Sequence, residues 1–389
     1  MRIVEVTDKR TRKEFIGVAV KIYRDYDRWI RPLDKDIELV FDTVNNKYFR
    51  NGEAARWILV DEGGESVGRV AAFYSTKTMN KDNDKPTGGM GFFECIDDTS
   101  AATMLFDQCK NWLTGKGMMA MDGPINFGER NEWWGLLIDS FDIEPNYRCN
   151  YHPPYYRKLF ESYGFQVYFK QLTYGRTVME PLVDKIYEKA NRIRQNPMYT
   201  FTTLDPSKMD QYIEYFKEIY NKAWSRHKGV PQLTSLQAKT VMNQLKPIID
   251  PKIMFFAFYN GIPSGFFIMI PEVNQIFKYV NGKLDLIGKL KFAWHKYRKS
   301  CRKMLGLVFG IIPEHQGKGL EGAIVMASRD LLQESYRRYD NLEMNWIGDF
   351  NPKMIHMVEQ VGAVVTKTHI TYRKLFDDKI PFRRYPTIG

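Results

Sequence analysis

Residues 305–329 read LGLVFGIIPEHQGKGLEGAIVMASR and contain the patterns of a strand, a glycine turn and a helix, in that order. The first part is an apolar, β-branched run that ends at Pro313, which is typical of a buried strand. The turn is Gln316-Gly317-Lys318-Gly319, after which apolar residues recur at helical spacing. Glycines let successive backbone N–H groups face one point, where the helix dipole adds positive charge. The stretch therefore predicts an anion site, with an ordinary strand-to-helix turn as the alternative.

The composition sets wider limits. A chain of 389 residues with 44% apolar and 26% charged residues favours two globular domains. Its net charge of +11 suits an anionic partner, such as a phosphorylated cofactor, nucleic acid or a membrane surface. The start has no signal-peptide pattern, and no apolar run approaches the roughly 20 residues that span a bilayer. We therefore expect a soluble cytoplasmic protein without stable membrane insertion.

The four cysteines carry a further indication. They are scattered and form no CxxC pair, which favours a reducing compartment and argues against a zinc site or a disulfide framework. We expect no metal site. The cysteines are Cys95, Cys109, Cys149 and Cys301.

The order of predicted elements occurs twice along the chain. Three pairs of residues match at nearly constant offsets of 197, 198 and 198: Gly68 with Gly265, Gly164 with Gly362, and Tyr174 with Tyr372. We interpret this as two copies of one α/β unit, with two unrelated α/β domains as the alternative. The predicted parts are an N-terminal domain (1–180), a connecting helix (181–198) and a C-terminal domain (199–389) with a basic helical insertion (272–304).

This element order, with a Q-G-x-G turn between an apolar strand and a helix, resembles the GNAT superfamily of acyl-CoA-dependent N-acyltransferases. Gln316, Gly319 and the following helix fit the family's Q/R-x-x-G-x-G/A loop, and residues 351–363 are similar to its later Asn…Gly-Phe helix. The motifs cover residues 199–376, and the first half resembles the family by element order alone. The resemblance implies an α/β (α+β) fold of two tandem GNAT-like domains, each a mixed, mostly antiparallel sheet flanked by helices.

The resemblance also implies a cofactor, acetyl-CoA or another acyl-CoA, whose pyrophosphate lies on the backbone N–H groups of residues 316–320. Two positions depart from the family, because Glu321 replaces a second glycine or alanine and Val358 replaces a tyrosine that often protonates the departing thiolate. The matching turn of the first half carries Asp97-Asp98, which would repel a pyrophosphate. We therefore expect one cofactor site, in the second half. The expected cofactor-binding residues are Ile311, Ile312, Gln316, Gly317, Lys318, Gly319, Leu320 and Asn351.

Direct acyl transfer to an amine needs a base, an oxyanion donor and an acid or solvent for the thiolate. Glu343 and Asn345 share one face of a predicted strand, so Glu343 is a candidate base and Asn345 a candidate lining residue of the cofactor slot. Tyr372 is a candidate substitute for the missing tyrosine, although its partner in the repeat suggests a structural role. Asn351 is expected either to bind the pantetheine or to cap a helix.

The long segment 122–150 has no clean period, and a loop of that length inside a domain is usually functional. Its carboxylates Asp122, Glu129 and Glu132 are alternative bases. We expect the loop to shape an acceptor pocket between the halves, with Trp133 and Trp134 as its walls.

The insertion has two interpretations. Apolar residues recur at helical spacing at Leu290, Trp294, Tyr297, Cys301 and Met304, while lysines and arginines occupy the other faces. Either the helix 286–304 packs through this stripe and leaves its basic face in solvent, or it offers a surface to anionic lipid, nucleic acid or an acidic partner.

Together these observations predict an acyl-CoA-dependent N-acyltransferase, with acetyl transfer from acetyl-CoA to an amine of a small molecule or peptide. The alternatives are a CoA-binding or sensing protein without catalysis, an aminoacyl-tRNA-dependent transferase, and a basic nucleic-acid-binding adaptor. The intact QGKG turn argues against the aminoacyl-tRNA alternative, because such enzymes need no CoA loop.

Overall fold

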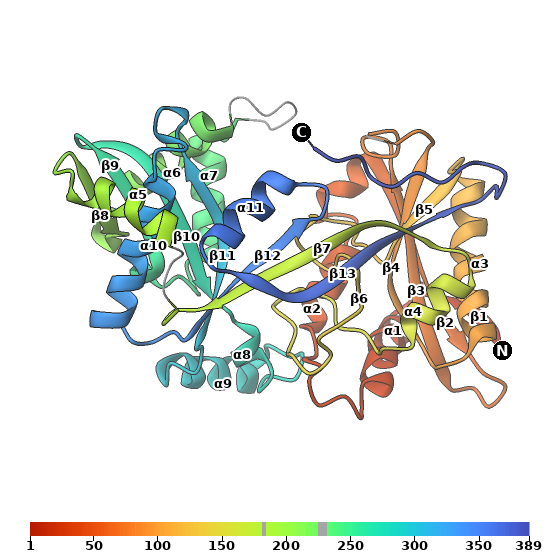
Figure 1. The fold of residues 1–389 in the computed structure, drawn as a ribbon. Helices are drawn as coiled ribbons and strands as arrows, with labels where there is room; N and C mark the ends of the chain where they lie inside the picture. Colours follow the sequence, from red (N-terminus) through yellow and green to blue (C-terminus); the bar gives the residue numbers. More distant parts are fainter. Residues whose placement is uncertain (82, 181–183, 225–231, 389) are drawn as a thin grey trace.

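The structure is a computed structural model that describes residues 1–81, 83–180, 184–224 and 232–388. Two α/β halves contribute to a single 13-stranded sheet (Figure 1). The first half comprises β1 (Arg2–Glu5), α1 (Lys9–Ile22), α2 (Asp34–Val40), β2 (Gly52–Val60), β3 (Ser66–Ser75), β4 (Thr87–Cys95), α3 (Thr99–Gly115), β5 (Ala120–Gly123), β6 (Leu136–Leu137), α4 (Tyr156–Ser162) and β7 (Gln166–Thr177).

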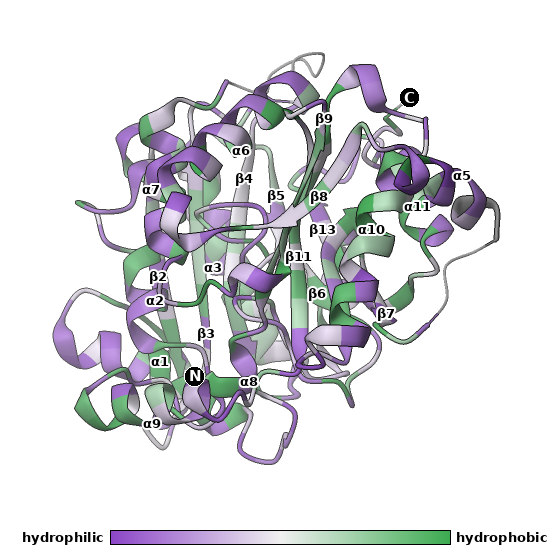
Figure 2. Ribbon diagram, turned by 90° about the vertical axis from the view of Figure 1, so that its left-hand side faces the viewer, coloured by the Kyte–Doolittle hydropathy of each residue, from purple (hydrophilic) through white to green (hydrophobic). Residues whose placement is uncertain are grey.

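The second half repeats the same order with additional helices. It comprises α5 (Asp184–Gln195), β8 (Tyr199–Thr203), α6 (Met209–Trp224), α7 (Ser235–Leu245), β9 (Met254–Tyr259), β10 (Ile262–Pro271), α8 (Asn274–Phe277), α9 (Leu286–Tyr297), β11 (Lys303–Ile311), α10 (Leu320–Asp330), β12 (Asn341–Gly348), α11 (Pro352–Gln360) and β13 (Val364–Leu375). In Figure 2, α2, α7 and α9 lie on one side of the sheet, and α5, α10 and α11 lie on the other. The expected mixed α/β architecture is confirmed.

The two halves exchange their last strands. The strand order is β1-β2-β3-β4-β5-β13-β7-β12-β11-β10-β9-β8, so β13 pairs with β5 of the first half and β7 pairs with β12 of the second. The two exchanged strands also pair with each other along the middle of the sheet (Figure 1). The halves are therefore joined by backbone hydrogen bonds rather than by side-chain packing alone.

The exchange favours the structural alternative for Tyr372 over a catalytic role at the thiolate. Its strand β13 places the ring in the core of the first half, where Tyr372 is fully buried and contacts Phe160 and Phe165. Its hydroxyl donates a hydrogen bond to Glu161 Oε1 at 2.9 Å. Since β7 and β12 separate it from β11 and its glycine turn, Tyr372 has a structural role.

One gap in the sheet positions the site. The strands β11 and β12 are parallel and pair only over Lys303–Gly306 and Asn341–Met344, although β11 continues to Ile311 and β12 to Gly348. Beyond these pairs the two strands diverge and leave space between them. The glycine turn follows the end of β11, so it lies at the open end of this gap.

Candidate functional site

The glycine turn has the backbone that its sequence predicts. Gly317 and Gly319 have φ angles of 72° and 102°, in the left-handed region that glycine adopts without strain. Gly319 is the N-cap of α10, and the Gln316 side-chain amide donates a hydrogen bond to the carbonyl oxygen of Ile311 at 2.8 Å. Lys318 is exposed beside them. The turn therefore presents backbone N–H groups at the start of a helix, as an anion site requires.

The other expected cofactor residues contribute less. The side chains of Ile311, Ile312 and Leu320 are buried in the core, so only their backbone groups face the turn. Asn351 caps α11, because its Oδ1 accepts a hydrogen bond from the Met354 N–H at 3.2 Å. The helix-cap interpretation of Asn351 thus describes its contacts in the structure.

Helix α5 lies across the glycine turn. Lys189 and Arg192 line a pocket of about 1100 Å³ together with Gly317, Gly319 and Glu321, and we call it the loop pocket. The contact is close, since a Cβ atom on Gly319 would lie 2.9 Å from the Lys189 carbonyl oxygen. The sequence predicts only a connecting helix over residues 181–198. The signal that it carried was the spacing of Lys189 and Arg192, which puts both cations on one face.

Glu321 occupies part of the predicted anion site. Its Oε1 accepts a hydrogen bond from the Gly317 N–H at 3.0 Å. A backbone donor that a phosphate would use is therefore engaged by a carboxylate of the protein itself, in the first turn of α10.

A second pocket occupies the gap between β11 and β12, and we call it the inter-strand pocket. It is open to solvent on one side and has a volume of about 720 Å³, and most of its lining is apolar. It shares Glu321, Met357 and Val361 with the loop pocket, so the two pockets adjoin, and we call the pair the channel. One end is glycine-rich and polar, with two cations and the carboxylates of Glu188 and Glu321, and the other end is apolar. The apolar lining residues are Phe267, Leu307, Val308, Phe309, Val325, Leu342, Met344, Ile347, Met354, Met357, Val358 and Val361.

Asn345 lies where this channel meets the space between the halves. It lines the inter-strand pocket and also an open cleft of about 820 Å³, which we call the inter-half cleft. The cleft is lined from the first half by Tyr48, Glu129, Arg130 and Asn131 and from the second by Asn345 and Trp346. The long loop therefore shapes an opening between the halves, and Glu129 is its only carboxylate among the described lining residues.

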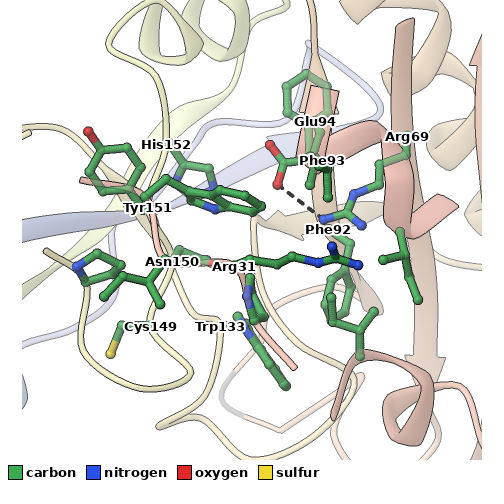
Figure 3. A pocket seen from close by; sticks show the side chains of 18 of the residues that line it. Arg31, Arg69, Phe92, Phe93, Glu94, Trp133, Cys149, Asn150, Tyr151 and His152 are labelled. Carbon is green, nitrogen blue, oxygen red and sulfur yellow. Dashed lines mark hydrogen bonds and ion pairs between the residues drawn. The ribbon is translucent and has the colours of Figure 1, made fainter. Parts of the chain in front are cut away.

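The two tryptophans of the loop lie in other places. Trp134 lines a separate first-half pocket together with Asp122, whose carboxylate is paired with Arg373. Trp133 lines the pocket in Figure 3. Glu132 is paired with Arg148 and lines none of these pockets.

Glu343 is held in a buried network of charges. Its carboxylate lies 2.8 Å from Lys367 Nζ and 3.2 Å from Lys303 Nζ, and it accepts a hydrogen bond from Asn146 Nδ2 at 2.6 Å. Burial alone would raise the pKa of Glu343, but the two lysines outweigh burial and lower the pKa to about 2. A carboxylate this acidic is a weak proton acceptor, and this argues against a role for Glu343 as the general base.

The loop connects this network to Asn345. Asn146 Nδ2 donates a second hydrogen bond to Asn345 Oδ1 at 2.8 Å, and Asn345 Nδ2 lies 3.3 Å from Cys149 Sγ. Asn146 is fully buried, and its Oδ1 has no hydrogen-bond partner among the described residues. The free acceptor is thus the Oδ1 of Asn146, which is hydrogen-bonded to Asn345, and Asn345 lines both the inter-strand pocket and the inter-half cleft.

Cys149 also borders a pocket of about 610 Å³ around Glu94 (Figure 3), which we call the Glu94 pocket. The Glu94 carboxylate is buried and accepts hydrogen bonds from Tyr23 at 2.7 Å and Tyr156 at 2.8 Å, with Arg69 at 3.3 Å. Burial raises the pKa of Glu94, and Arg69 opposes that shift. No sequence pattern identifies this carboxylate, because its partners Tyr23, Arg69 and Tyr156 come from three separate segments.

Comparison with known proteins places the fold in context. No protein-family model matches the chain. Among curated proteins, it is 26% identical over 379 residues to "Bacterial ceramide synthase" of Caulobacter vibrioides (strain NA1000 / CB15N), covering 96% of this chain and 97% of that protein. It is 25% identical over 376 residues to "Protein YghO" of Escherichia coli (strain K12), covering 94% and 93%.

Solved structures resemble the whole chain. A tandem GNAT protein from the clavulanic acid biosynthesis pathway superimposes with a TM-score of 0.53 at 9% identity, covering 97% of this chain and 98% of that one. A GCN5-related glucosamine N-acetyltransferase region of a fungal multi-domain protein gives 0.51 at 13% identity, covering 96% and 38%. The chain has the GNAT fold, in a tandem arrangement.

Proposed function

We propose that this tandem GNAT-fold chain is an acyl-CoA-dependent N-acyltransferase that uses acyl groups longer than acetyl. The observation that carries the proposal is the channel in the second half. Its glycine-rich end offers backbone N–H groups, Lys189 and Arg192, which suit the phosphates of CoA. Its other end is a large apolar pocket, which suits a fatty acyl chain better than a two-carbon acetyl group.

The reaction would be a direct transfer between two bound substrates. The amine nitrogen attacks the thioester carbonyl carbon, a C–N bond forms, the C–S bond breaks and the CoA thiolate leaves. The amine loses one proton and the thiolate gains one. Asn345 lies where the donor channel and the inter-half cleft meet, so its side-chain amide is placed to orient the reacting groups.

The base that takes the proton from the amine should lie on the side where the amine binds. We assign the base to Glu129, the carboxylate of the inter-half cleft, which lies 2.7 Å from Lys47 Nζ. Glu94 is the alternative, since burial raises its pKa and makes it a stronger proton acceptor than an ordinary glutamate. Glu343 keeps its charge and acts through Asn146, which it holds against Asn345. We therefore describe Glu343 as a positioning residue.

The relatives supply a candidate acceptor. The name of the Caulobacter relative specifies ceramide, which is a fatty amide of a long-chain amino alcohol. An acceptor of this class has a primary amine on a lipid chain, and its N-acylation needs a fatty acyl donor. Both requirements agree with the apolar channel, so we propose a lipid amine as the acceptor rather than a peptide.

Calorimetric titration tests the donor. CoA, acetyl-CoA and a long-chain acyl-CoA, each below its micelle concentration, should all bind, and affinity should rise with acyl length. Mass spectrometry should then detect an amide when a long-chain amino alcohol is added. Failure of every acyl-CoA to bind would overturn the proposal, while binding without turnover across a panel of amines favours the CoA-sensing alternative.

The variant Glu321→Gln locates the phosphates. Replacing the carboxylate with a neutral amide weakens the hydrogen bond from the Gly317 N–H and removes a like charge from the pyrophosphate, so the Kd for CoA should fall about fivefold. The lost interaction with the helix dipole should cost about 0.5 kcal/mol of stability. Glu314→Gln is the matched control, because this exposed carboxylate precedes the turn and lines neither pocket. Unchanged affinity in Glu321→Gln would place the pyrophosphate elsewhere.

A further inference from the structure

Helix α9 carries large hydrophobic side chains on its outer surface. Ile287, Leu290, Trp294 and Tyr297 recur at the spacing of one helical face, and Leu286 adjoins them. Their exposed fractions are 65%, 64%, 56% and 81%, with 75% for Leu286. In Figure 2, α9 lies at the lower edge of the molecule, on the side of the sheet opposite α10. A contiguous apolar face of this kind on a soluble surface marks an interaction site.

The helix packs through its other face. Gly288 is buried, Phe292 stacks on Phe277 with ring centroids 5.5 Å apart, and His295 stacks on Tyr279 at 3.9 Å. The predicted stripe is therefore divided: Leu290, Trp294 and Tyr297 are exposed, whereas Cys301 and Met304 lie beyond the end of α9 and are buried. The more apolar face of the helix is the one that faces solvent.

Cations flank the apolar face on both sides. At 3.6 residues per turn, Lys289 and Lys296 lie along one flank, and Lys291 and Arg298 lie along the other. The only acidic residue between positions 278 and 303 is Asp285, and its side chain is engaged as the N-cap of the helix. The charge around the face is thus positive over residues 278–303.

We propose that α9 docks the protein onto an anionic membrane surface, lying in the plane of the interface. An apolar face with tryptophan and tyrosine, bordered by lysine and arginine, has the pattern of a helix that inserts between lipid headgroups. Nucleic acid accounts for the cations but offers no partner for the aliphatic Leu286, Ile287 and Leu290. The face therefore favours a membrane over RNA.

The insertion also borders the acceptor side of the molecule. The Asp34 N–H donates a hydrogen bond to the Gly282 carbonyl oxygen at 2.8 Å, and Asp34 and Arg31 line the Glu94 pocket (Figure 3). Asn274 Nδ2 donates a hydrogen bond to the Pro145 carbonyl oxygen at 2.9 Å, next to Asn146. Docking through α9 would therefore bring a bilayer beside the segments that hold Asn345. The conclusion that the bilayer supplies a lipid amine rests on the proposed function.

Vesicle co-sedimentation of the full chain tests the docking. Equimolar phosphatidylcholine and phosphatidylglycerol vesicles should bind the protein, more strongly at low than at high salt. Leu290→Glu combined with Trp294→Glu should weaken that binding about tenfold or more. Leu236→Glu is the matched control, because Leu236 lies on α7, on the same side of the sheet, is 76% exposed, and should leave binding unchanged.

Each outcome is decisive. Absence of binding to the anionic vesicles at low salt, or equal binding by the α9 double variant, overturns the proposal. Binding of the wild type to RNA but not to vesicles overturns it in favour of a nucleic-acid partner. Turnover of a short, water-soluble amine without vesicles should be equal in the wild type and the double variant. Absence of turnover in the wild type with every amine, long-chain amino alcohols included, would reject the proposed function and leave the docking result standing.

Discussion

Glu343 shows how one residue can join the two halves. Its carboxylate neutralises Lys367 of the exchanged strand β13 and Lys303 of β11, while Asn146 approaches from the loop of the first half. All of these groups are largely buried, and burial lowers the pKa of Lys367. A buried pair is costly to break from one side, because the remaining charge has no partner and little water.

Glu343→Gln should therefore act mainly on stability. Removing the charge leaves two buried or half-buried lysines without their anion, which should cost about 3–5 kcal/mol of the free energy of unfolding. The pH dependence has a defined sign. The pKa of Glu343 falls from 4.5 to about 2 on folding, so its contribution is complete above pH 4.5 and is lost as pH falls toward 2. This shift corresponds to roughly 3 kcal/mol.

Urea unfolding from pH 7 to pH 3 measures both effects. Asp340→Asn is the control, because Asp340 forms an exposed ion pair with Arg302 near the same strand and should cost no more than about 1 kcal/mol. A stable Glu343→Gln protein that has lost all turnover would restore Glu343 as the base.

At the scale of elements, the exchanged strand makes stability a property of the whole chain. Tyr372 comes from the end of the sequence but fills the core of the first half. Tyr372→Ala should therefore cost about 4 kcal/mol, the price of a large buried cavity. Because β13 also pairs with β7, which pairs with β12, the loss should lower the stability of both halves in one transition.

Hydrogen exchange during urea unfolding tests this coupling. Amides of β2 and β3 in the first half and of β9 and β10 in the second should lose protection at the same urea concentration. Tyr297→Ala is the control, since this tyrosine is exposed on α9 and its removal should leave stability unchanged. Two separate transitions, with only the first half weakened, would contradict the coupling.

The exchange also explains which parts of the fold could be predicted. Matching pairs such as Gly164 and Gly362 identify two copies, because a helix that ends at a left-handed glycine is a local feature. The glycine turn could be predicted for the same reason. The partners of β7 and β13 could not, because both strands carry the same pattern and either could close either half. For the same reason, the position of Tyr372 in the core of the first half could not be predicted.

Helix α9 shows a second limit. Its period predicts a helix, but it has two stripes: Gly288, Phe292 and His295 on one side, and Leu290, Trp294 and Tyr297 on the other. Hydrophobicity alone predicts that the second stripe packs against the protein. The structure selects the first, because Phe277 and Tyr279 of the same insertion provide its stacking partners. The choice depends on tertiary contacts that no local pattern contains.

At the scale of the whole molecule, neither half holds a complete site. The channel is built on the glycine turn, β11 and β12, but Arg176 of β7 lines it from the first half. The inter-half cleft takes Tyr48 and Glu129 from the first half and Asn345 from the second. The junction of the two pockets thus exists only while the halves stay together.

Cutting the chain between its halves tests this dependence. A protease site can replace residues 181–183, between β7 and α5, so that cleavage leaves β7 on the first fragment and β13 on the second. In the first fragment, β7 pairs with β12 of the second. In the second fragment, β13 pairs with β5 of the first, and β7 and β13 also pair with each other. The fragments should co-elute at the size of the intact chain and retain acyl-CoA binding. They should separate only in denaturant, because release requires opening the β7–β12, β5–β13 and β7–β13 ladders at once. Separation in native buffer would mean that the exchanged strands do not hold the halves together. The inter-half cleft would then not depend on these strands.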